Sequence, residues 1–342
     1  MPATTDEMRM ADAIELGASV RTSTAPNPWV GAVIVSADGS RHAGATEPPG
    51  QRHAEVVALD AARAAGGDAA TRGATVYVTL EPCAHTGRTG PCSEALIAAG
   101  VSRVVVGVAD PDPLVAGAGM AQLRDHGIAV ELGCRGDEVA EQLAAYLHHR
   151  RTGRPWVVLK LAATLDGRTA AADGTSQWIT GEAARADAHR IRAESQAVVV
   201  GAGTVAADDP SLTTRLVDGP DPRRVVLGRA PEGARVHPCT EWTSDDGDLD
   251  DLLDRLGDEG VVQVLVEGGA SVAGSFHRAG LVDHYVLYLA PALAGGDDAP
   301  GLFRGAGAVS IDDLWRGEIQ AVTAVGGDIR VDVRPVPEPG DR

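Results

Sequence analysis

His53-Ala54-Glu55 is the stretch that decides the fold of the first half of this sequence. Pro82-Cys83 and Cys92, further along the chain, complete it. One imidazole and two thiolates form a mixed nitrogen and sulfur ligand set that suits Zn²⁺. Three protein ligands leave the fourth tetrahedral position open for water, which is the arrangement of a catalytic zinc site. We therefore predict that His53, Cys83 and Cys92 bind zinc, and that Glu55 lies beside the metal as a proton carrier.

The flanking sequence agrees with a metal site. A strand expected over 75–80 leads to Cys83, and a helix expected from Ser93 follows Cys92, so both sulfurs converge at helix N-termini, where partial positive charge favours thiolate. The order of the motifs is typical of zinc deaminases, in which activated water attacks an amino-bearing ring carbon while a glutamate carries protons. A disulfide between the two cysteines, or a closed structural zinc site, is the alternative at this point.

Length and composition favour a cytoplasmic protein of two domains. The 342 residues exceed one ordinary core, and we expect domains over 1–150 and 151–342, joined by a basic, Gly/Pro-marked hinge at 148–155. No apolar run approaches the roughly 20 residues of a membrane span, and the N-terminus lacks a basic region followed by an apolar one. Cys134 and Cys239 are expected to be free thiols, which fits a reducing compartment.

The net charge restricts the partners. A formal charge of −18 argues against nucleic acid, because affinity for nucleic acid comes largely from Lys and Arg that neutralise phosphates. A deaminase that acts on a small molecule is therefore favoured over one that edits RNA or DNA. No membrane partner is expected either.

Lys160 is the only lysine among the 30 basic residues counted as Lys plus Arg. It lies inside the apolar strand expected over 156–164, where an ammonium is costly unless it has a partner. We interpret it as a functional group that faces a ligand. The alternative is that it extends along the strand edge to solvent.

Strands and helices alternate along the chain, which predicts α/β domains with a mostly parallel or mixed sheet covered by helices. In the first half we expect a helix from Asp6, as its cap, to Leu16, and a loop over 44–52. The other elements expected there are strands over 30–35, 75–80, 103–108 and 128–132, and helices from 54, over 93–99 and 118–126, and from 137. In the second half we expect strands over 156–164, 198–200, 224–227, 261–266 and 283–290. We also expect a helix over 182–194, a helix that ends near 279, and an exposed acidic segment from 241 to 254 that runs into a short helix.

Two glycine-rich turns in the second half are candidate cofactor contacts. Gly201-Ala202-Gly203 superficially fits a dinucleotide fingerprint, but Asp208-Asp209-Pro210 stops the following helix within a turn, which disfavours a Rossmann fold. Glu267-Gly268-Gly269-Ala270-Ser271 joins a strand to a helix N-terminus, an arrangement suited to a dinucleotide phosphate. A tight turn that needs no ligand is the alternative for this second segment.

Taken together, the two halves resemble the bifunctional riboflavin-biosynthesis deaminase/reductase family over about residues 6 to 334. The motifs that carry the resemblance in the first half are Pro26-Asn27-Pro28, His53-Ala54-Glu55, Pro82-Cys83-Ala84-His85, Gly87-Arg88-Thr89, Pro91-Cys92 and Asp110-Pro111. Those in the second half are Lys160, Leu165-Asp166-Gly167, Ser176-Gln177-Trp178-Ile179-Thr180, His189-Arg190-Ile191-Arg192-Ala193, Gly203-Thr204-Val205, Asp208-Asp209-Pro210 and Val266-Glu267-Gly268-Gly269.

The resemblance implies an N-terminal cytidine-deaminase-like three-layer α/β/α domain and a C-terminal dihydrofolate-reductase-like α/β domain. The first would hydrolyse the 2-amino group of 2,5-diamino-6-ribosylamino-4(3H)-pyrimidinone 5′-phosphate. The second would then reduce the ribosylamino side chain to ribitylamino with NADPH. Phosphorylated pyrimidine substrates and a homo-oligomer, a dimer or larger, are also implied.

The resemblance also implies roles for individual residues. Glu55 would shuttle protons, and Asp208 would assist the reduction. The substrate contacts would be Asn27, His85 and Arg88 in the first domain and Lys160, Ser176, Arg192, Leu212, Arg215 and Glu267 in the second. The cofactor contacts would be Ala162, Trp178, Thr204, Asp208, Gly269, Ala270, Ser271, Val272, Ala273, Gly274 and Ser275. The chain departs from the family at Thr46 and Val57, near the expected deaminase pocket, where the family often has histidine.

Two other functions compete with this interpretation. The first is a deaminase of free nucleosides or of tRNA fused to a degenerate partner; the acidic charge speaks against tRNA, and intact Asp208 and Glu267 speak against degeneracy. The second is a non-catalytic zinc scaffold or NADP-sensing module. Glu55 disfavours it, because a closed site with four ligands has no use for a carboxylate beside an open position.

Overall fold

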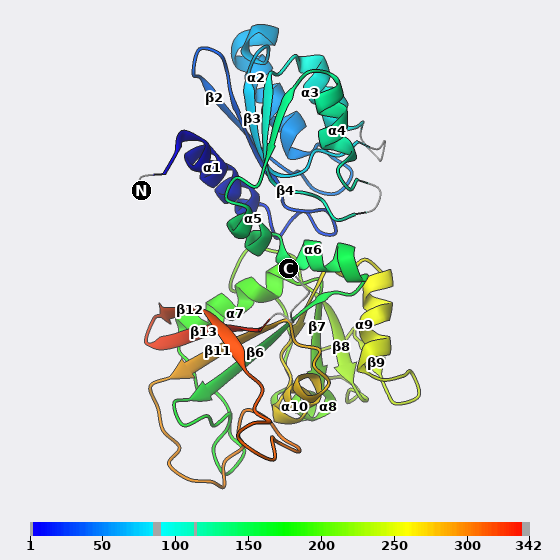
Figure 1. Cartoon of the computed structure of the whole chain (residues 1–342). Helices are drawn as coiled ribbons and strands as arrows, with labels where there is room; N and C mark the ends of the chain where they lie inside the picture. The colour runs from blue at the N-terminus through cyan, green and yellow to red at the C-terminus, as the bar shows by residue number, and fades with distance from the viewer. Residues whose placement is uncertain (1–2, 85–89, 113–114, 337–342) are drawn as a thin grey trace. The chain divides into compact units, whose positions relative to one another are not determined.

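The computed structural model describes residues 3–84, 90–112 and 115–336, and the chain divides into two compact units, Met1–Gly153 and Arg154–Arg342 (Figure 1). The division follows helix α6 (Ala144–Thr152), which ends at Gly153 with a φ of 77°, a left-handed conformation that favours glycine. The first part of the hinge expected over 148–155, residues 148–152, is therefore helical. We expected one helix from 137, but the structure has two helices there, because α5 (Gly136–Gln142) precedes α6.

Unit 1 is a three-layer α/β/α domain, as expected. Its sheet has the order β2-β1-β3-β4-β5, in which β1 pairs antiparallel with β2 and β3, and β3, β4 and β5 are parallel. The strands are β1 (Gly31–Val35), β2 (Arg41–Ala45), β3 (Thr75–Leu80), β4 (Arg103–Val108) and β5 (Ala129–Leu132). Helices α1 and α5 contact each other on one face of the sheet (Figure 1). On the other face, α2 contacts α3, and α3 contacts α4. These helices are α1 (Thr5–Ser19), α2 (Ala54–Gly66), α3 (Cys92–Ala99) and α4 (Ala118–Asp125), and a 3₁₀ turn, Gly67–Ala70, follows α2.

Two expectations for unit 1 are wrong. The loop expected over 44–52 begins inside β2, which pairs with β1 from Gly31↔Ala45 onwards. The cap of α1 is Thr4, not Asp6: the Thr4 hydroxyl accepts from the Glu7 main-chain N–H at 3.2 Å, and the Glu7 carboxylate accepts from the Thr4 N–H at 2.6 Å. Asp6 instead pairs with Arg103 on β4 at 2.6 Å.

Unit 2 is built on an eight-stranded sheet with the order β12-β13-β11-β6-β10-β7-β8-β9. The strands from β11 to β9 in this order are parallel to one another. Strand β13 pairs antiparallel with β11, and β12 pairs antiparallel with β13. The strands are β6 (Trp156–Thr164), β7 (Ala197–Gly201), β8 (Arg223–Leu227), β9 (Thr240–Trp242), β10 (Gln263–Val266), β11 (His284–Ala290), β12 (Gly317–Val325) and β13 (Asp328–Pro335). The helices are α7 (Glu182–Glu194), α8 (Ala202–Asp208), α9 (Leu249–Asp258) and α10 (Ala270–Arg278).

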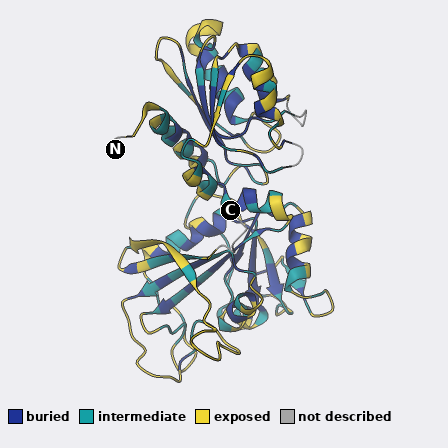
Figure 2. Cartoon of the chain, in the orientation of Figure 1, coloured by how far each residue is buried: buried dark blue, intermediate teal, exposed yellow. Residues whose placement is uncertain are grey.

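Two apolar clusters cover the two faces of this sheet. Leu159 and Leu161 of β6 belong to the cluster that includes side chains of α9 and α10, whereas Val158 belongs to the cluster that includes side chains of α7 and α8. Because neighbouring residues of a strand point to opposite faces, Lys160 and Ala162 lie on the α7 side. Figure 2 shows the buried central strands of this sheet and the exposed strand β12 at its edge.

Three strands of unit 2 were not expected from the sequence. Strands β12 and β13 lie at one edge of the sheet and β9 at the other. The acidic segment expected to be exposed from 241 also contributes to the core, because Trp242 is 6% exposed and Leu252 and Leu253 on α9 are fully buried. Within α9, Asp251 and Asp254 are exposed on the outer side of an amphipathic helix.

The helices of the described ranges are short. The longest, α1, has 15 residues. None of these helices combines the length and the apolar character that a membrane span requires.

Candidate active sites

The three predicted metal ligands lie together in unit 1. His53 is the cap residue of α2, Cys83 follows β3, and Cys92 is the first residue of α3. The His53 Nδ1 atom lies 3.2 Å from Cys92 Sγ and 3.6 Å from Cys83 Sγ. The ligand atoms of the three residues all lie within 4.8 Å of one another. Two helix starts and one strand end therefore bring the motif residues to one point.

The distances between these atoms fit a tetrahedral zinc ion. With Zn–S near 2.3 Å and Zn–N near 2.0–2.1 Å, tetrahedral angles place the ligand atoms roughly 3.6–3.8 Å apart. The observed 3.6 Å between His53 Nδ1 and Cys83 Sγ lies in this range, and the 3.2 Å between His53 Nδ1 and Cys92 Sγ is shorter than it. All four cysteines are free, as expected for Cys134 and Cys239, so the alternative of a disulfide between Cys83 and Cys92 is wrong.

Cys83 is the more acidic of the two thiols. A hydrogen bond from the Cys92 side chain lowers the pKa of Cys83 against the opposing effect of burial, and His53 and the Cys92 main-chain N–H, 3.3 Å from Cys83 Sγ, act in the same direction. Thiolate is the form that binds a metal. The site therefore favours the ligand form of this cysteine before any metal arrives.

Glu55 lies in the first turn of α2 and is 4% exposed. Burial raises the pKa of its carboxyl to about 7, and the negative charge of Cys83 adds to this effect. A carboxyl that titrates near neutral pH can both accept and donate a proton at that pH. Its position beside His53 suits proton transfer next to the metal site.

The structure describes only some of the other residues expected at the deaminase pocket. Asn27 is half-buried, a few residues before β1, and His85 and Arg88 lie outside the described residues. Thr46 is 4% exposed, and its hydroxyl accepts from the Val30 main-chain N–H at 3.2 Å. This departure from the family therefore supports the main chain at the start of β1.

In unit 2, Glu267 joins two of the basic residues singled out in the sequence. Its carboxylate makes two hydrogen bonds with Arg192 of α7, at 2.8 and 3.0 Å, and lies 3.7 Å from Lys160 Nζ of β6. Burial alone would raise the pKa of Glu267, but the charges of Arg192 and Lys160 outweigh it and lower this pKa to about 2. The sole lysine thus points to a buried carboxylate, and its side chain is only 21% exposed, so it does not extend to open solvent.

Arg215 contributes to the same positive region. Burial, and then the charges of Arg192 and Arg215, lower the pKa of the buried His189 imidazole to about 4. The Arg215 side chain is exposed and donates to Ser211 Oγ at 3.1 Å. Leu212 is 5% exposed and has a φ of 52°, and its side chain belongs to the apolar core.

The two glycine-rich turns lie side by side. The Gly269 N–H donates to Thr204 Oγ1 at 3.2 Å, which joins the start of α10 to α8. At the end of α8, Asp208 Oδ1 accepts a hydrogen bond from Ser176 Oγ at 3.1 Å. Of the predicted cofactor contacts in α10, Ala273 and Gly274 are buried.

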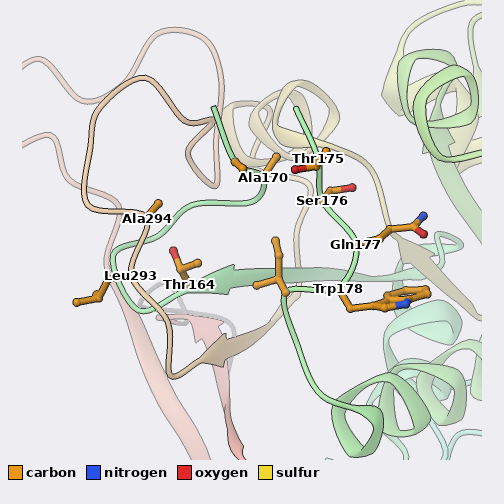
Figure 3. A pocket seen from close by; sticks show the side chains of 10 residues that line it. Thr164, Ala170, Thr175, Ser176, Gln177, Trp178, Leu293 and Ala294 are labelled. Carbon is orange, nitrogen blue, oxygen red and sulfur yellow. The ribbon is translucent and has the colours of Figure 1, made fainter. Parts of the chain in front are cut away.

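A cavity of about 220 Å³ lies at the carboxyl end of β6 (Figure 3). Its lining comes from three segments, with Leu293 and Ala294 on one wall and Ser176 and Trp178 on another, and it consists of Thr164, Ala170, Ala171, Thr175, Ser176, Gln177, Trp178, Ile179, Leu293 and Ala294. Trp178 is 64% exposed, and the Arg185 guanidinium lies 4.6 Å from the centre of its ring.

Sequence reasoning missed most of this lining. The alternation of β6 would have placed Thr164 on the face of Lys160 and Ala162. Leu293 and Ala294 follow β11 in a loop, and no local pattern distinguishes them. Only the folded chain brings that loop to the end of β6.

Comparisons with protein families match each unit to a different domain. Residues 3–108 match the cytidine and deoxycytidylate deaminase zinc-binding region, and residues 155–331 match the RibD C-terminal domain. The riboflavin biosynthesis protein RibD of Mycobacterium tuberculosis is 45% identical over 335 residues, covering 94% of each chain. That of Bacillus amyloliquefaciens is 41% identical over 362 residues, covering 96% of each chain.

Solved structures resemble both units. Acinetobacter baumannii RibD, form 1, has a TM-score of 0.88 and 39% identity, covering 97% of this chain and 99% of its own. The diaminohydroxyphosphoribosylaminopyrimidine deaminase/5-amino-6-(5-phosphoribosylamino)uracil reductase of Thermotoga maritima has a TM-score of 0.89 and 33% identity, with the same coverage.

Proposed function

Because this chain belongs to the RibD family of bifunctional riboflavin-biosynthesis enzymes, we propose that its two units catalyse two consecutive reactions on one phosphorylated pyrimidine. Unit 1 would hydrolyse the 2-amino group of 2,5-diamino-6-ribosylamino-4(3H)-pyrimidinone 5′-phosphate. Unit 2 would then reduce 5-amino-6-(5-phosphoribosylamino)uracil to its ribitylamino product. The observation that carries the proposal is the three-ligand metal site with a buried glutamate beside it.

For deamination, His53, Cys83 and Cys92 would hold zinc and leave one coordination position for water. When bound, zinc supplies a Lewis acid that lowers the pKa of that water. Glu55 would take a proton from the water and deliver it to the departing amino group. A buried carboxyl with a pKa near 7 is suited to both transfers.

For reduction, the basic residues of unit 2 would hold the substrate's phosphate. A protein with a net charge of −18 repels an anion unless positive charge is concentrated at the site. Lys160, Arg192 and Arg215 supply such a region. Glu267 fixes the directions of Lys160 and Arg192, since it pairs with both. Charge-assisted bonds from a guanidinium suit a phosphate group.

Zinc and NADPH are the cofactors of the two domains in this family, and we propose NADPH as the hydride source for unit 2. The start of α10, with the N–H groups of its first turn, would take the anionic phosphates. The cavity of about 220 Å³ is smaller than the 300–1,000 Å³ typical of a whole ligand site, so it suits one ring of the cofactor or substrate. Asp208, oriented by Ser176, would assist proton transfer during the reduction.

Mass spectrometry of the zinc-loaded protein with the diaminopyrimidinone ribosyl phosphate tests both reactions. Without NADPH, we expect exchange of the amino group for an oxo group. With NADPH, a gain of two hydrogens should follow. Reduction in the absence of prior deamination would contradict the proposed order. If neither product appears, the substrate assignment is wrong, and free nucleosides should be tested on the zinc site.

We also infer a homo-oligomer in which a second copy covers strand β12. This strand forms one edge of the sheet, and Ile319 and Val322 on it are 65% and 62% exposed. Sheet edges are usually protected by charged residues, yet β12 contains one charged residue, Glu318. An antiparallel copy of the same strand would pair its free edge and cover these side chains without opposing like charges.

Light scattering after size-exclusion chromatography tests this inference. The wild type should have a mass at least twice the 35.1 kDa of one chain. The double variant Ile319→Lys, Val322→Glu should have the mass of one chain. Leu132→Lys is a matched control, because Leu132 is an exposed apolar residue on the edge strand β5 of unit 1, and it should not change the mass. A wild type with the mass of one chain would contradict the inference.

A further inference from the structure

Glu81 is a buried carboxylate, 3% exposed, that the chemistry proposed above does not use. It follows β3 and stands two residues before the metal ligand Cys83. Its carboxylate accepts hydrogen bonds from four main-chain N–H groups. Oε1 accepts from Gly119 and Met120 at 3.1 and 3.2 Å, and Oε2 accepts from Gly117 and Asp110 at 3.1 and 3.4 Å.

These bonds join the cysteine segment to helix α4. Gly119 and Met120 belong to the first turn of α4, where main-chain N–H groups have no partner within the helix. A carboxylate at a helix N-terminus is also favoured by the helix dipole. Glu81 therefore satisfies donors of α4 and fastens the start of this helix beside the end of β3.

The main chain of α4 also packs directly on the residue before Cys83. A Cβ atom added to Gly119 would lie 1.8 Å from the Pro82 carbonyl oxygen, so only glycine fits at this position. The helix and the Pro82-Cys83 segment thus meet with no side chain between them. A shift of α4 would be transmitted to Cys83 through this contact.

The second cysteine is joined to the same helix by its neighbour. The Ser93 main-chain N–H donates to the Cys83 carbonyl oxygen at 3.1 Å. The Ser93 hydroxyl lies 3.0 Å from that carbonyl oxygen and 2.6 Å from Gln122 Oε1 of α4. Because Ser93 directly follows Cys92, both metal-binding cysteines are connected to each other and to α4.

We propose that Glu81 is a positioning residue that sets the separation of the Cys83 and Cys92 sulfurs by fastening their segments to α4. The proposal deepens the zinc-dependent deamination proposed above and rests on it for its function. Groups behind metal ligands orient those ligands and affect metal affinity. Glutamine would keep the size of this side chain but would turn an amide NH₂ towards two of the N–H donors, which cannot bond to it.

The test is metal binding by full-length Glu81→Gln, compared with the wild type. Zinc affinity is measured by competition with a chromophoric chelator, and ligand geometry by the visible absorption spectrum of the Co²⁺-loaded protein. We expect roughly 10- to 100-fold weaker zinc binding, the range typical of changes behind metal ligands, and a shifted Co²⁺ spectrum. Asp166→Asn is a matched control, because the Asp166 carboxylate also accepts two main-chain N–H bonds, at 3.1 and 2.8 Å, but in unit 2. It should change neither quantity.

Circular dichroism and thermal unfolding show whether Glu81→Gln is folded. If it is not, Gln122→Ala, which removes only the α4 partner of Ser93, is measured in the same way and should shift the Co²⁺ spectrum in the same sense. Wild-type zinc affinity together with an unchanged Co²⁺ spectrum in a folded variant would overturn the proposal. A wild type that binds zinc but does not deaminate the pyrimidine would contradict the proposed function and leave the positioning role intact.

Discussion

At the scale of single residues, Glu55 distinguishes a catalytic zinc site from a structural one. Glu55→Gln keeps the shape of the side chain but cannot carry a proton, so zinc should stay bound while deamination is lost. We expect a decrease in kcat of about 10²- to 10⁴-fold, the usual contribution of general acid–base catalysis. Metal content by mass spectrometry and the rate of amino loss are the two measurements. Loss of zinc together with activity would assign Glu55 a structural role.

Asp208 is the residue of unit 2 that we propose assists the reduction. Asp208→Asn can still accept the hydrogen bond from Ser176 but lacks the charge, so reduction should fall while deamination stays unchanged. NADPH consumption and amino loss are measured on the same sample. The adjacent Asp209→Asn is the control, since Asp209 is exposed and pairs with Arg235. If Asp208→Asn reduced both activities equally, the model of two separate sites would be wrong.

At the scale of elements, the Glu267 cluster fastens helix α7 to the sheet. Removing one partner of a buried ion pair leaves the other charge without compensation, which typically costs about 3–5 kcal/mol. Glu267→Gln leaves the charge of Arg192 without compensation. We therefore expect the free energy of unfolding, measured with urea, to fall by about 3–5 kcal/mol. Glu259→Gln is the control, because its pairs with Arg223 and Arg255 are exposed, and such pairs contribute about 0–1 kcal/mol. Similar losses in the two variants would contradict the role of burial.

The same cluster predicts a pH dependence of stability. The pKa of Glu267 falls from its ordinary value of 4.5 to about 2 in the folded protein. A lowered carboxyl pKa stabilises the fold above the unfolded value, and this contribution is lost as pH falls from about 4.5 towards 2. The difference in unfolding free energy between wild type and Glu267→Gln should therefore shrink over this window. A difference that stays constant with pH would show that the charge of Glu267 does not stabilise the fold.

At the scale of the whole molecule, the division into two units predicts that metal affects only one of them. A ligand that binds only the folded state stabilises it by an amount that grows with concentration, about 4 kcal/mol at a thousandfold excess over Kd. Chelation of zinc should therefore lower the melting temperature of unit 1 and leave that of unit 2 unchanged. Scanning calorimetry measures both transitions, and added zinc should restore the first. Equal shifts of both transitions would contradict a metal site confined to unit 1.

Elements with a strong local signal were predicted closely. Strands β3, β4 and β6 and helix α7 have the predicted limits, because long apolar runs and clear breaks mark them in the sequence. The clustering of His53, Cys83 and Cys92 was also predictable, since few combinations of residues bind zinc and the motif order is restrictive. The cytoplasmic location and the roles of the predicted catalytic, substrate-binding and cofactor-binding residues stay predictions.

Elements that depend on pairing were missed. Strands β2, β9 and β12 are short, polar or exposed, and their hydrogen bonds to neighbouring strands stabilise them more than their own side chains do. The prediction that Asp6 caps α1 was wrong for a similar reason. Arg103 and Tyr77, both distant in sequence, bind the Asp6 carboxylate.

The sequence by itself determined the two α/β units, the His/Cys cluster that can hold a metal with Glu55 near it, and the basic and glycine-rich segments of unit 2. These features depend on residue type and local spacing, which a linear pattern contains. Only the tertiary structure decided that Glu267 joins Lys160 to Arg192, that Leu293 lines the cavity, and that Glu81 holds helix α4 against the cysteines. These contacts join residues far apart in the chain, and the packing of whole elements, not local pattern, brings them together.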